Sequence, residues 1–273
     1  MSSQLRFLVI GAHPDDPDIR FGGTAIKLIQ KGHCVKFVSL TNGNCGHEHM
    51  PPELLAKRRW QEAQDAAKIL GVDSYEILDI NDCELEVNLV TRKRLMKIIR
   101  DFRPDMVLSH RSYDYHSDHR ACAQLVQDCA FMVQVPLFCP ESKVPEKNPV
   151  FAFLYDSFTK PEAFRMDAII PIDDVMDQKN KALDCHKSQF YEWLPFIMKL
   201  EEKNFEEFSW KEKSQYLTKY WGERFAQAAE KTKEILQETY GEKAKEIKYT
   251  EVFEISEYGR KVSKEEFQEM LDG

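Results

Sequence analysis

The stretch Ile10-Gly-Ala-His-Pro-Asp-Asp-Pro-Asp18 connects the short apolar run 6–10 to a segment with helical character, 25–30. The apolar run is short and contains β-branched residues, which is typical of a buried strand. One imidazole and three carboxylates therefore lie where a strand passes into a helix. Ligands of open α/β sheets bind outside the carboxyl ends of the strands, so we expect chemistry at this turn. Because the turn is acidic, it can hold a metal cation and is unsuited to a phosphate.

Strands and helices alternate along the chain and are joined by short loops. Further strands are predicted over 34–40, 75–80, 105–109, 150–155 and 167–172, and helices over 52–70, 91–102, 119–133 and 181–189. This alternation predicts an α/β fold with a Rossmann-like, mainly parallel sheet flanked by helices. The remaining third is rich in aromatic and charged residues and predicts a mostly helical C-terminal extension. We therefore divide the chain into a Rossmann-like core, 1–190, and an extension, 191–273, packed on the core or continuing the same domain.

The composition of the chain limits the partners that it can have. Its 273 residues, of which 42% are hydrophobic, are enough to bury one sizeable core. The net charge of −8 argues against nucleic acid or an anionic membrane as a partner. No apolar run approaches the ~20 residues that span a bilayer, and the N-terminus has no pattern of a signal peptide. Seven cysteines without a Cys-x-x-Cys pair indicate reduced thiols and a cytoplasmic location.

His13, Asp15 and Asp16 are candidate metal ligands in the first acidic turn. A catalytic zinc site uses three protein ligands and a water, so at least one ligand must come from elsewhere in the chain. The alternative is that the aspartates cap the following helix, where carboxylates favour the positive end of the dipole. A dinucleotide site is disfavoured, because the turn has no Gly-x-Gly-x-x-Gly and its carboxylates would repel a pyrophosphate.

The loop after the strand 105–109 is a second group of polar residues, and it includes His116, Asp118 and His119. The helix that follows has an inward stripe formed by Cys122, Val126, Cys129 and Val133. Extended backwards, this stripe reaches His119, which predicts a ligand that lies close to the first turn. The alternative is that His119 is a structural histidine of the core. We interpret His110 in this way.

The polar groups of the two loops exceed what one metal ion needs. A spare carboxylate can remove a proton from water, and an imidazolium held by a carboxylate can stabilise an oxyanion or protonate a leaving group. His116 with Asp118 suits the second task. The two loops therefore indicate an enzyme.

Three motifs, Ala12-His-Pro-Asp-Asp16, Gly22-Gly-Thr24 and His116-Ser-Asp-His119, resemble those of the PIG-L/LmbE-like zinc-dependent de-N-acetylases. The resemblance covers roughly residues 7–189, with Ser117 where many members have proline. It implies that zinc, or another divalent metal, is bound by His13, Asp16 and His119. It also implies that Asp15 is the general base, that His116 stabilises the tetrahedral intermediate and that Asp118 orients His116.

Two further residues are candidate substrate contacts. Arg59, in a segment that resembles the family's Arg-x-x-Glu helix, interrupts an apolar stripe, and a buried arginine needs an anion. That anion is either the substrate or Glu62. Asp82 lies where family members often have Asp-Gly, and it either binds sugar hydroxyls or is an ordinary turn aspartate. The three tryptophans Trp193, Trp210 and Trp221 could stack on sugar, although packing against the core is favoured.

The resemblance implies a hydrolase of linear amides other than peptide bonds, which removes an N-acetyl group from an amino-sugar derivative such as an N-acetylglucosaminide. The binding partner of such an enzyme would be a small N-acetylated sugar conjugate. Related enzymes often assemble, so the resemblance is also compatible with a homo-oligomer. The alternatives are a metal-dependent hydrolase of another amide or an ester, and a metal-binding protein without catalysis.

Overall fold

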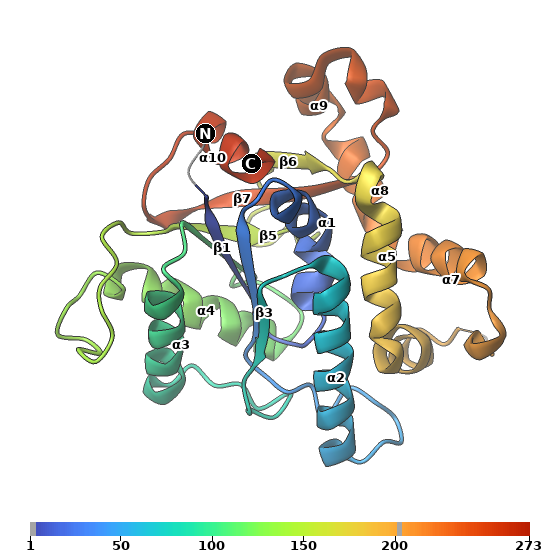
Figure 1. Ribbon diagram of the computed structural model, residues 1–273, viewed down its shortest axis with the longest axis horizontal. Helices are drawn as coiled ribbons and strands as arrows, with labels where there is room; N and C mark the ends of the chain where they lie inside the picture. The colour runs from blue at the N-terminus through green and yellow to red at the C-terminus, as the bar shows by residue number, and fades with distance from the viewer. Residues whose placement is uncertain (1–3, 201–203) are drawn as a thin grey trace.

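The computed structural model describes residues 4–200 and 204–273, which form a seven-stranded mixed sheet between layers of helices (Figure 1). The strands are β1 (Arg6–Gly11), β2 (Cys34–Ser39), β3 (Ser74–Ile77), β4 (Met106–Ser109), β5 (Val150–Leu154), β6 (Ala168–Pro171) and β7 (Thr250–Gly259). The longer helices are α1 (Asp16–Gln30), α2 (Pro52–Leu70), α3 (Leu89–Phe102), α4 (Ser117–Met132), α5 (Met176–Cys185), α7 (Trp210–Leu217), α8 (Glu223–Lys231), α9 (Lys233–Tyr240) and α10 (Lys264–Asp272), and α6 (Leu194–Ile197) is a single turn.

The strand order β3-β2-β1-β4-β5-β7-β6 confirms the predicted α/β fold with a mainly parallel sheet. The strands from β3 to β5 run parallel to their neighbours, and β7 runs antiparallel to both β5 and β6. The chain moves outward from β1 to β3 and then returns to β4 on the other side of β1. This reversal creates a switch point between β1 and β4, where a crevice opens at the carboxyl ends of the strands.

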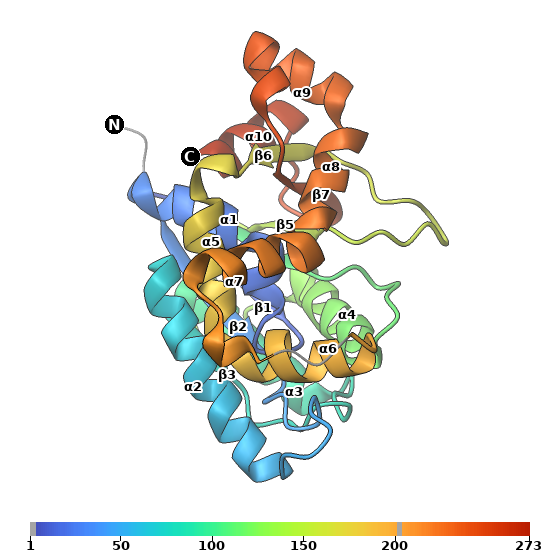
Figure 2. The ribbon, with the colours of Figure 1, turned by 90° about the vertical axis from the view of Figure 1, so that its right-hand side faces the viewer.

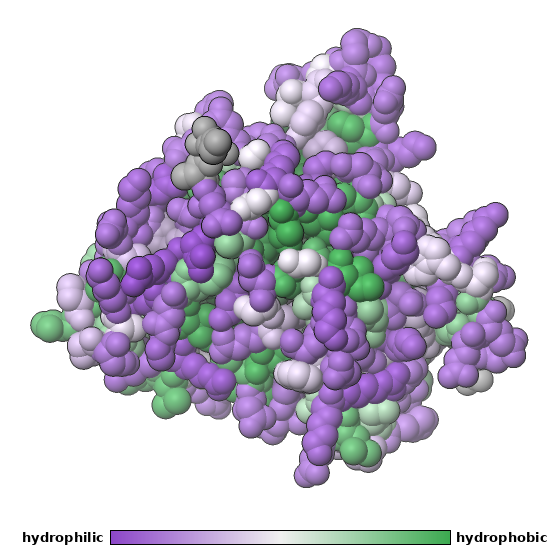
Figure 3. All heavy atoms as spheres, viewed as in Figure 1, coloured by the Kyte–Doolittle hydropathy of each residue, from purple (hydrophilic) through white to green (hydrophobic). Residues whose placement is uncertain are grey.

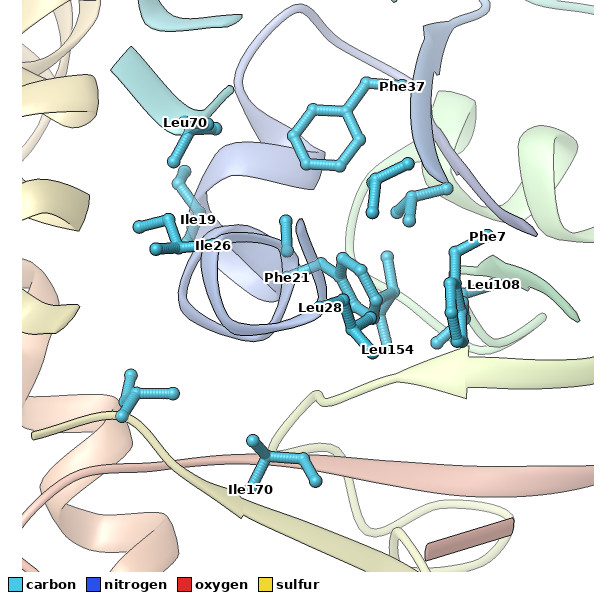
Figure 4. Close-up of a cluster of buried hydrophobic side chains, with 14 of the residues drawn as sticks. Phe7, Ile19, Phe21, Ile26, Leu28, Phe37, Leu70, Leu108, Leu154 and Ile170 are labelled. Carbon is cyan, nitrogen blue, oxygen red and sulfur yellow. The ribbon is translucent and has the colours of Figure 1, made fainter. Parts of the chain in front are cut away.

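Both faces of the sheet are covered, as a parallel sheet requires. Helices α3 and α4 lie on one face, and α1, α2 and α5 lie on the other (Figures 1 and 2). Alternate residues of β1 point to opposite faces: Phe7 and Val9 join one buried cluster, and Leu8 and Ile10 join the other. Figure 4 shows the first cluster, in which Phe7, Phe21 and Phe37 pack between the sheet and α1. The sheet is therefore a rigid base for the loops at its edge.

The C-terminal region contributes a strand that we did not anticipate from the sequence. β7 lies between β5 and β6, so this region completes the sheet as well as adding helices. Within this region Thr232 separates the helices α8 and α9. The division of the chain at residue 190 stays a prediction.

Two further observations concern the surface and the thiols. The face in Figure 3 is mainly hydrophilic, with a hydrophobic patch over α1 and α5. Within the described residues, none of the helices has the length and apolar character needed to cross a membrane. All seven cysteines are free thiols.

Candidate active site

The ends of β1 and β4 bring the two polar loops together at the switch point. His13 follows β1, Asp16 begins α1, and His119 lies in the first turn of α4. Nδ1 of His13 lies 3.2 Å from Nε2 of His119, and each nitrogen lies 3.4 Å from one carboxylate oxygen of Asp16. All three side chains are buried. The residues assigned as ligands thus form one compact group.

The spacing of these three atoms fits a bound divalent metal. In a tetrahedral site with ligands about 2.0–2.1 Å from the ion, the ligand atoms lie about 3.3–3.4 Å from one another. Two imidazoles and one carboxylate also form a donor set that zinc commonly uses in catalytic sites. Within residues 4–200 and 204–273, the other two groups of close His and Asp ligand atoms are His13-Asp82-His116 and His110-Asp114-His119. Each shares a histidine with the first group, so the three groups describe one centre.

The imidazole nitrogens that face away from this group each lie against a carboxylate. Nε2 of His13 lies 3.1 Å from Asp82 and 3.5 Å from Asp118, and Nδ1 of His119 lies 3.0 Å from Asp114. Such carboxylate–histidine pairs fix the tautomer of a metal-binding histidine and raise its basicity. Nδ1 of His13 and Nε2 of His119 are then the ring atoms that face the candidate metal position. The structure thus places Asp82 behind the candidate ligand His13, and it adds Asp114, which we had not singled out, behind His119.

We expect Asp114→Asn to weaken metal binding about 10- to 100-fold, the usual effect of losing such a supporting carboxylate. The amide has nearly the same shape, so the loop should keep its fold while His119 loses its anionic partner. Competition against a fluorescent chelator measures the affinity, and Asp101→Asn on the surface of α3 is the matched control. Equal affinities for the two variants would show that Asp114 does not support the metal centre.

Backbone and side-chain donors hold the Asp16 carboxylate in place. Its Oδ2 accepts hydrogen bonds from the backbone N–H groups of Ala12 (3.1 Å) and His13 (2.8 Å), and it lies 3.2 Å from Nε2 of His110. The His110 ring also stacks on His119, with ring centroids 4.1 Å apart. Burial and the neighbouring His119 lower the pKa of His110 to about 4. Nε2 of His110 thus lies between the Asp16 carboxylate and the backbone N–H of Ala12, 3.2 Å from each, so His110 contacts both Asp16 and His119, a role that goes beyond the structural one we expected.

Gly11 allows the turn to close because a side chain at this position has no room. A Cβ atom there would lie 2.6 Å from Cβ of Asp16 and 2.8 Å from Cδ of Pro17. We expect Gly11→Ala to displace Asp16, to weaken metal binding and to lower the free energy of unfolding by about 1–3 kcal/mol. Chelator competition and chemical denaturation measure these two effects.

Gly22→Ala is the matched control, because the nearest atom to its Cβ, Cδ2 of Leu70, is 3.6 Å away. Alanine is favoured over glycine inside a helix by about 1 kcal/mol, so this variant should be as stable as the natural protein or more so. Normal metal binding by Gly11→Ala would contradict the steric argument.

The electrostatics of the centre favour a positive charge. Burial alone would lower the pKa of His13, but hydrogen bonds to Asp118, Asp16 and Asp82 outweigh it and raise this pKa well above its usual value. Burial opposes ionisation of Asp16 and Asp114, yet the nearby His119 helps to hold both pKa values low, that of Asp114 at about 2. A cluster that attracts a proton onto a buried imidazole also attracts a metal cation.

Asp15 lies beside the ligands and is held by Arg59. Nη2 of Arg59 lies 3.2 Å from Oδ1 of Asp15, and Nη1 donates to the carbonyl oxygen of Gly43 at 3.1 Å. Glu62 pairs instead with Arg58 and with Ser188. From the sequence we had left open whether Arg59 pairs with Glu62 or with the substrate. The structure shows that Arg59 does not pair with Glu62. Arg59 neutralises Asp15 and also lines the pocket described below.

His116 caps α4 and contacts the ring of His13, with ring centroids 4.6 Å apart. Its Nδ1 accepts a hydrogen bond from the backbone N–H of Asp118 at 3.2 Å, so the proton of the neutral ring is on Nε2. Burial and the charges of His13 and His119 lower the pKa of His116. The Asp118 carboxylate accepts a hydrogen bond from the backbone N–H of Cys83 and approaches His13, so it reaches His116 only through the backbone.

The metal-facing atoms open into a pocket of about 210 Å³. Its C-terminal wall comes from two π-helical turns, Ser188–Trp193 and Thr218–Gly222, a rare geometry that is frequent at functional sites. Gln189, on the first of these turns, lines the pocket. The pocket residues on α1, α6 and α8 are ones that the sequence did not reveal: Ile19, Arg20, Leu194, Ile197 and Arg224. Trp193 and Trp221 also line the pocket, whereas Trp210 donates to Asp177 on the surface. No local motif marks these residues, so pattern alone could not find them.

Comparison with known proteins identifies the family. The family described as "PIG-L: GlcNAc-PI de-N-acetylase" matches residues 8–130. The diacetylchitobiose deacetylase of Thermococcus kodakarensis is 33% identical over 206 residues, which cover 70% of this chain and 74% of that protein. This chain belongs to the PIG-L family.

Other PIG-L relatives differ in their named activities. The 4-oxalmesaconate hydratase of Pseudomonas putida is 31% identical over 194 residues, which cover 68% of this chain and 74% of that protein. The structure of N,N'-diacetylchitobiose deacetylase from Pyrococcus horikoshii superposes with a TM-score of 0.68 and 26% identity, and covers 93% of this chain and 84% of that one. The PIG-L match contains both ligand loops but ends before the π-helical turns. The part of the pocket that contains the candidate metal ligands thus lies within the family match, and residues beyond the match form the rest of its wall.

Proposed function

We propose that this protein is a zinc-dependent de-N-acetylase that hydrolyses the acetamide of an amino-sugar derivative, such as an N-acetylglucosaminide, and releases acetate. The observation that carries this proposal is a carboxylate, Asp15, that lies beside three suitably spaced ligands but is not one of them. Relatives named as sugar deacetylases support the substrate class. We also propose a cytoplasmic location, which the free thiols support.

His13, Asp16 and His119 would hold the zinc ion. Bound there, zinc polarises the acetyl carbonyl and lowers the pKa of a water molecule towards ~7. Asp16 and Asp15 are adjacent in sequence but point to different partners, the histidines and Arg59. This separation leaves the Asp15 carboxylate free for proton transfer while Asp16 is committed to binding.

Asp15 accepts the proton of the water that attacks the acetyl carbon. The hydrogen bond from Arg59 holds this carboxylate in the pocket wall. When the C–N bond breaks, the same proton passes to the departing nitrogen, which leaves as the amine while the acyl group leaves as acetate. Asp15 therefore acts first as a base and then as an acid.

His116 supplies the hydrogen bond that the developing oxyanion needs. Its Nδ1 is occupied by the backbone N–H of Asp118, so Nε2–H is the donor that can face the substrate. A fixed donor in a half-buried site stabilises an oxyanion without reorganising during the reaction. Asp118 positions His116 through this backbone contact.

A hydratase is the second candidate, since one relative at 31% identity is named as such. The same base could deprotonate a water molecule that adds to a carbon–carbon double bond instead of an amide carbon. The two activities give different products, so one set of assays separates them.

The test is to incubate the zinc-loaded protein with N-acetylglucosamine, N,N'-diacetylchitobiose and N-acetylglucosaminyl malate, and to measure acetate and free amine. We expect both products in equal amounts, and their loss with a chelator. Acetate from simple esters alone would indicate a different hydrolase. If no acetate forms and unsaturated carboxylic acids are hydrated, the hydratase assignment replaces the deacetylase one.

A further inference from the structure

Two arginines form part of the pocket wall, and neither takes part in the chemistry proposed above. Arg20 lies on α1, one helical turn after Asp16, and Arg224 lies in the first turn of α8. Both line the same pocket as the metal-facing histidines. Arg20 is in the region matched by the family, whereas Arg224 is almost a hundred residues beyond the end of that match.

The two guanidinium groups have different surroundings. Nη1 of Arg20 donates to the carbonyl oxygen of Tyr155, and its Nη2 lies 3.9 Å from Asp114. Within residues 4–200 and 204–273, Arg224 makes no hydrogen bond and no ion pair. Its guanidinium carbon lies 5.7 Å from the ring centroid of Trp221, another residue of the pocket wall. Arg224 is thus half-buried with its donors available to a ligand.

The carboxylates of the site compensate Arg224 only in part, because each has a nearer cationic or imidazole partner. Asp15 is paired with Arg59, Asp16 with the two ligand histidines, and Asp114 with His119. Burial and the charge of Arg20 lower the pKa of Arg224 to about 10, although nearby acidic groups raise it. Arg224 therefore stays charged at neutral pH at an electrostatic cost that an anion in the pocket would relieve. A bound divalent metal adds to the positive potential and increases the attraction for such an anion.

We propose that Arg224 and Arg20 form an anion-binding subsite in the active-site pocket, and that the substrate carries a carboxylate or a phosphate on its sugar portion. The inference rests on the proposed de-N-acetylase function for the identity of that substrate. Planar guanidinium groups bind both anions through paired N–H donors.

This subsite would determine how the substrate is oriented. The acetamide lies at the metal-binding loops, so the sugar extends towards the wall formed by Trp193 and Trp221. Arg224 is adjacent to Trp221 along this wall, so it meets a group attached to the sugar and not the acetyl group. Arg224 is then a specificity-determining residue, and a substrate without the anionic group should react without any contribution from Arg224.

The test compares pairs of substrates in which one member carries an anionic substituent and the other is neutral. N-Acetylglucosamine is paired with its 6-phosphate, and methyl N-acetylglucosaminide is paired with N-acetylglucosaminyl malate. We expect the natural protein to prefer the anionic member of at least one pair in kcat/KM. Arg224→Gln should reduce kcat/KM for that member about 10- to 100-fold, the usual effect of losing charge-assisted hydrogen bonds, and leave the neutral member within about threefold. Which pair responds identifies phosphate or carboxylate.

Two control variants sharpen the comparison. Arg94→Gln, an exposed arginine on α3, should leave both members of a pair unchanged. Arg224→Lys keeps the charge and should recover part of the preference. An equal loss on neutral and anionic substrates would overturn the proposal, because Arg224 would then act on the shared acetamide. No loss on either member would also overturn it.

A binding experiment separates this proposal from the deacetylase function. L-Malate and inorganic phosphate are titrated by calorimetry into the metal-loaded natural protein, Arg224→Gln and Arg94→Gln. The metal contributes equally to all three, so weaker binding by Arg224→Gln alone supports the subsite even if no acetate is released. Acetate release with equal anion binding by all three proteins supports the function and overturns the subsite.

Discussion

Replacement of Asp15 by Asn should lower kcat for acetate release by about 10²–10⁴-fold while the protein keeps its full complement of metal. The variant removes the proton acceptor but none of the three ligands. Asn is a better choice than Ala, because the amide oxygen can still accept the hydrogen bond from Arg59, which is only 2% exposed. Initial rates of acetate release and elemental analysis of the same sample measure the two properties together.

The matched control is Asp65→Asn, an aspartate on α2 whose side chain is 45% exposed and pairs with Lys68. It makes the same chemical change outside the pocket and should keep normal rates. If Asp15→Asn retained more than about a tenth of the natural kcat, a different group would be the base. If it lost its metal, Asp15 would belong among the ligands, and the division of roles between Asp15 and Asp16 would be wrong.

Replacement of His119 by Asn should abolish activity through loss of the metal itself. Structural zinc is bound with about 10–16 kcal/mol shared among its ligands, so losing one ligand should weaken affinity on the order of 10²–10³-fold or more. Asn is polar and close to His119 in size, so it limits the cavity beside His110, which stacks on the His119 ring. Metal content after dialysis against a chelator is the direct measurement, and circular dichroism checks that the variant is folded.

His49→Ala is the control, since His49 is exposed in the loop between β2 and α2. It should retain metal and activity. A folded His119→Asn protein that held zinc as tightly as this control would exclude the proposed ligand set. Restoration of activity by added zinc in excess would instead support it, because a weakened site can still be filled by mass action.

Much of the fold was predictable because the first 172 residues follow simple periodic rules. The strands predicted over 6–10, 34–40, 105–109, 150–155 and 167–172 match β1, β2, β4, β5 and β6 closely. Their residues are buried on both faces, so they form continuous apolar runs that need no partner to be recognised. The two ligand loops were found for a related reason, since each directly follows such a strand.

The strand β7 escaped prediction because its sequence contains charged residues that only distant partners satisfy. Glu251 is 2% exposed, and it accepts hydrogen bonds from the backbone N–H groups of Gly23 (2.9 Å) and Thr24 (2.8 Å). It also pairs with the buried Lys179. These partners are distant in sequence, and without them a glutamate indicates an exposed position.

The same network explains one of the glycines of α1. In the structure, a Cβ atom at Gly23 would lie 2.6 Å from Ile172 and 3.1 Å from Glu251. Gly23 therefore allows close packing between α1 and the C-terminal part of the sheet.

By itself, the sequence determined the α/β class, the two acidic and histidine-rich loops, and the family to which their motifs belong. The ends of strands and short motifs are local features, so the order of residues in the chain is enough to identify them. Only the tertiary structure decided which carboxylate supports which histidine, that Arg59 meets Asp15, and that Arg224 reaches the metal-binding pocket. These contacts join residues far apart in the chain, and they form only when the packed sheet brings its loops to one edge.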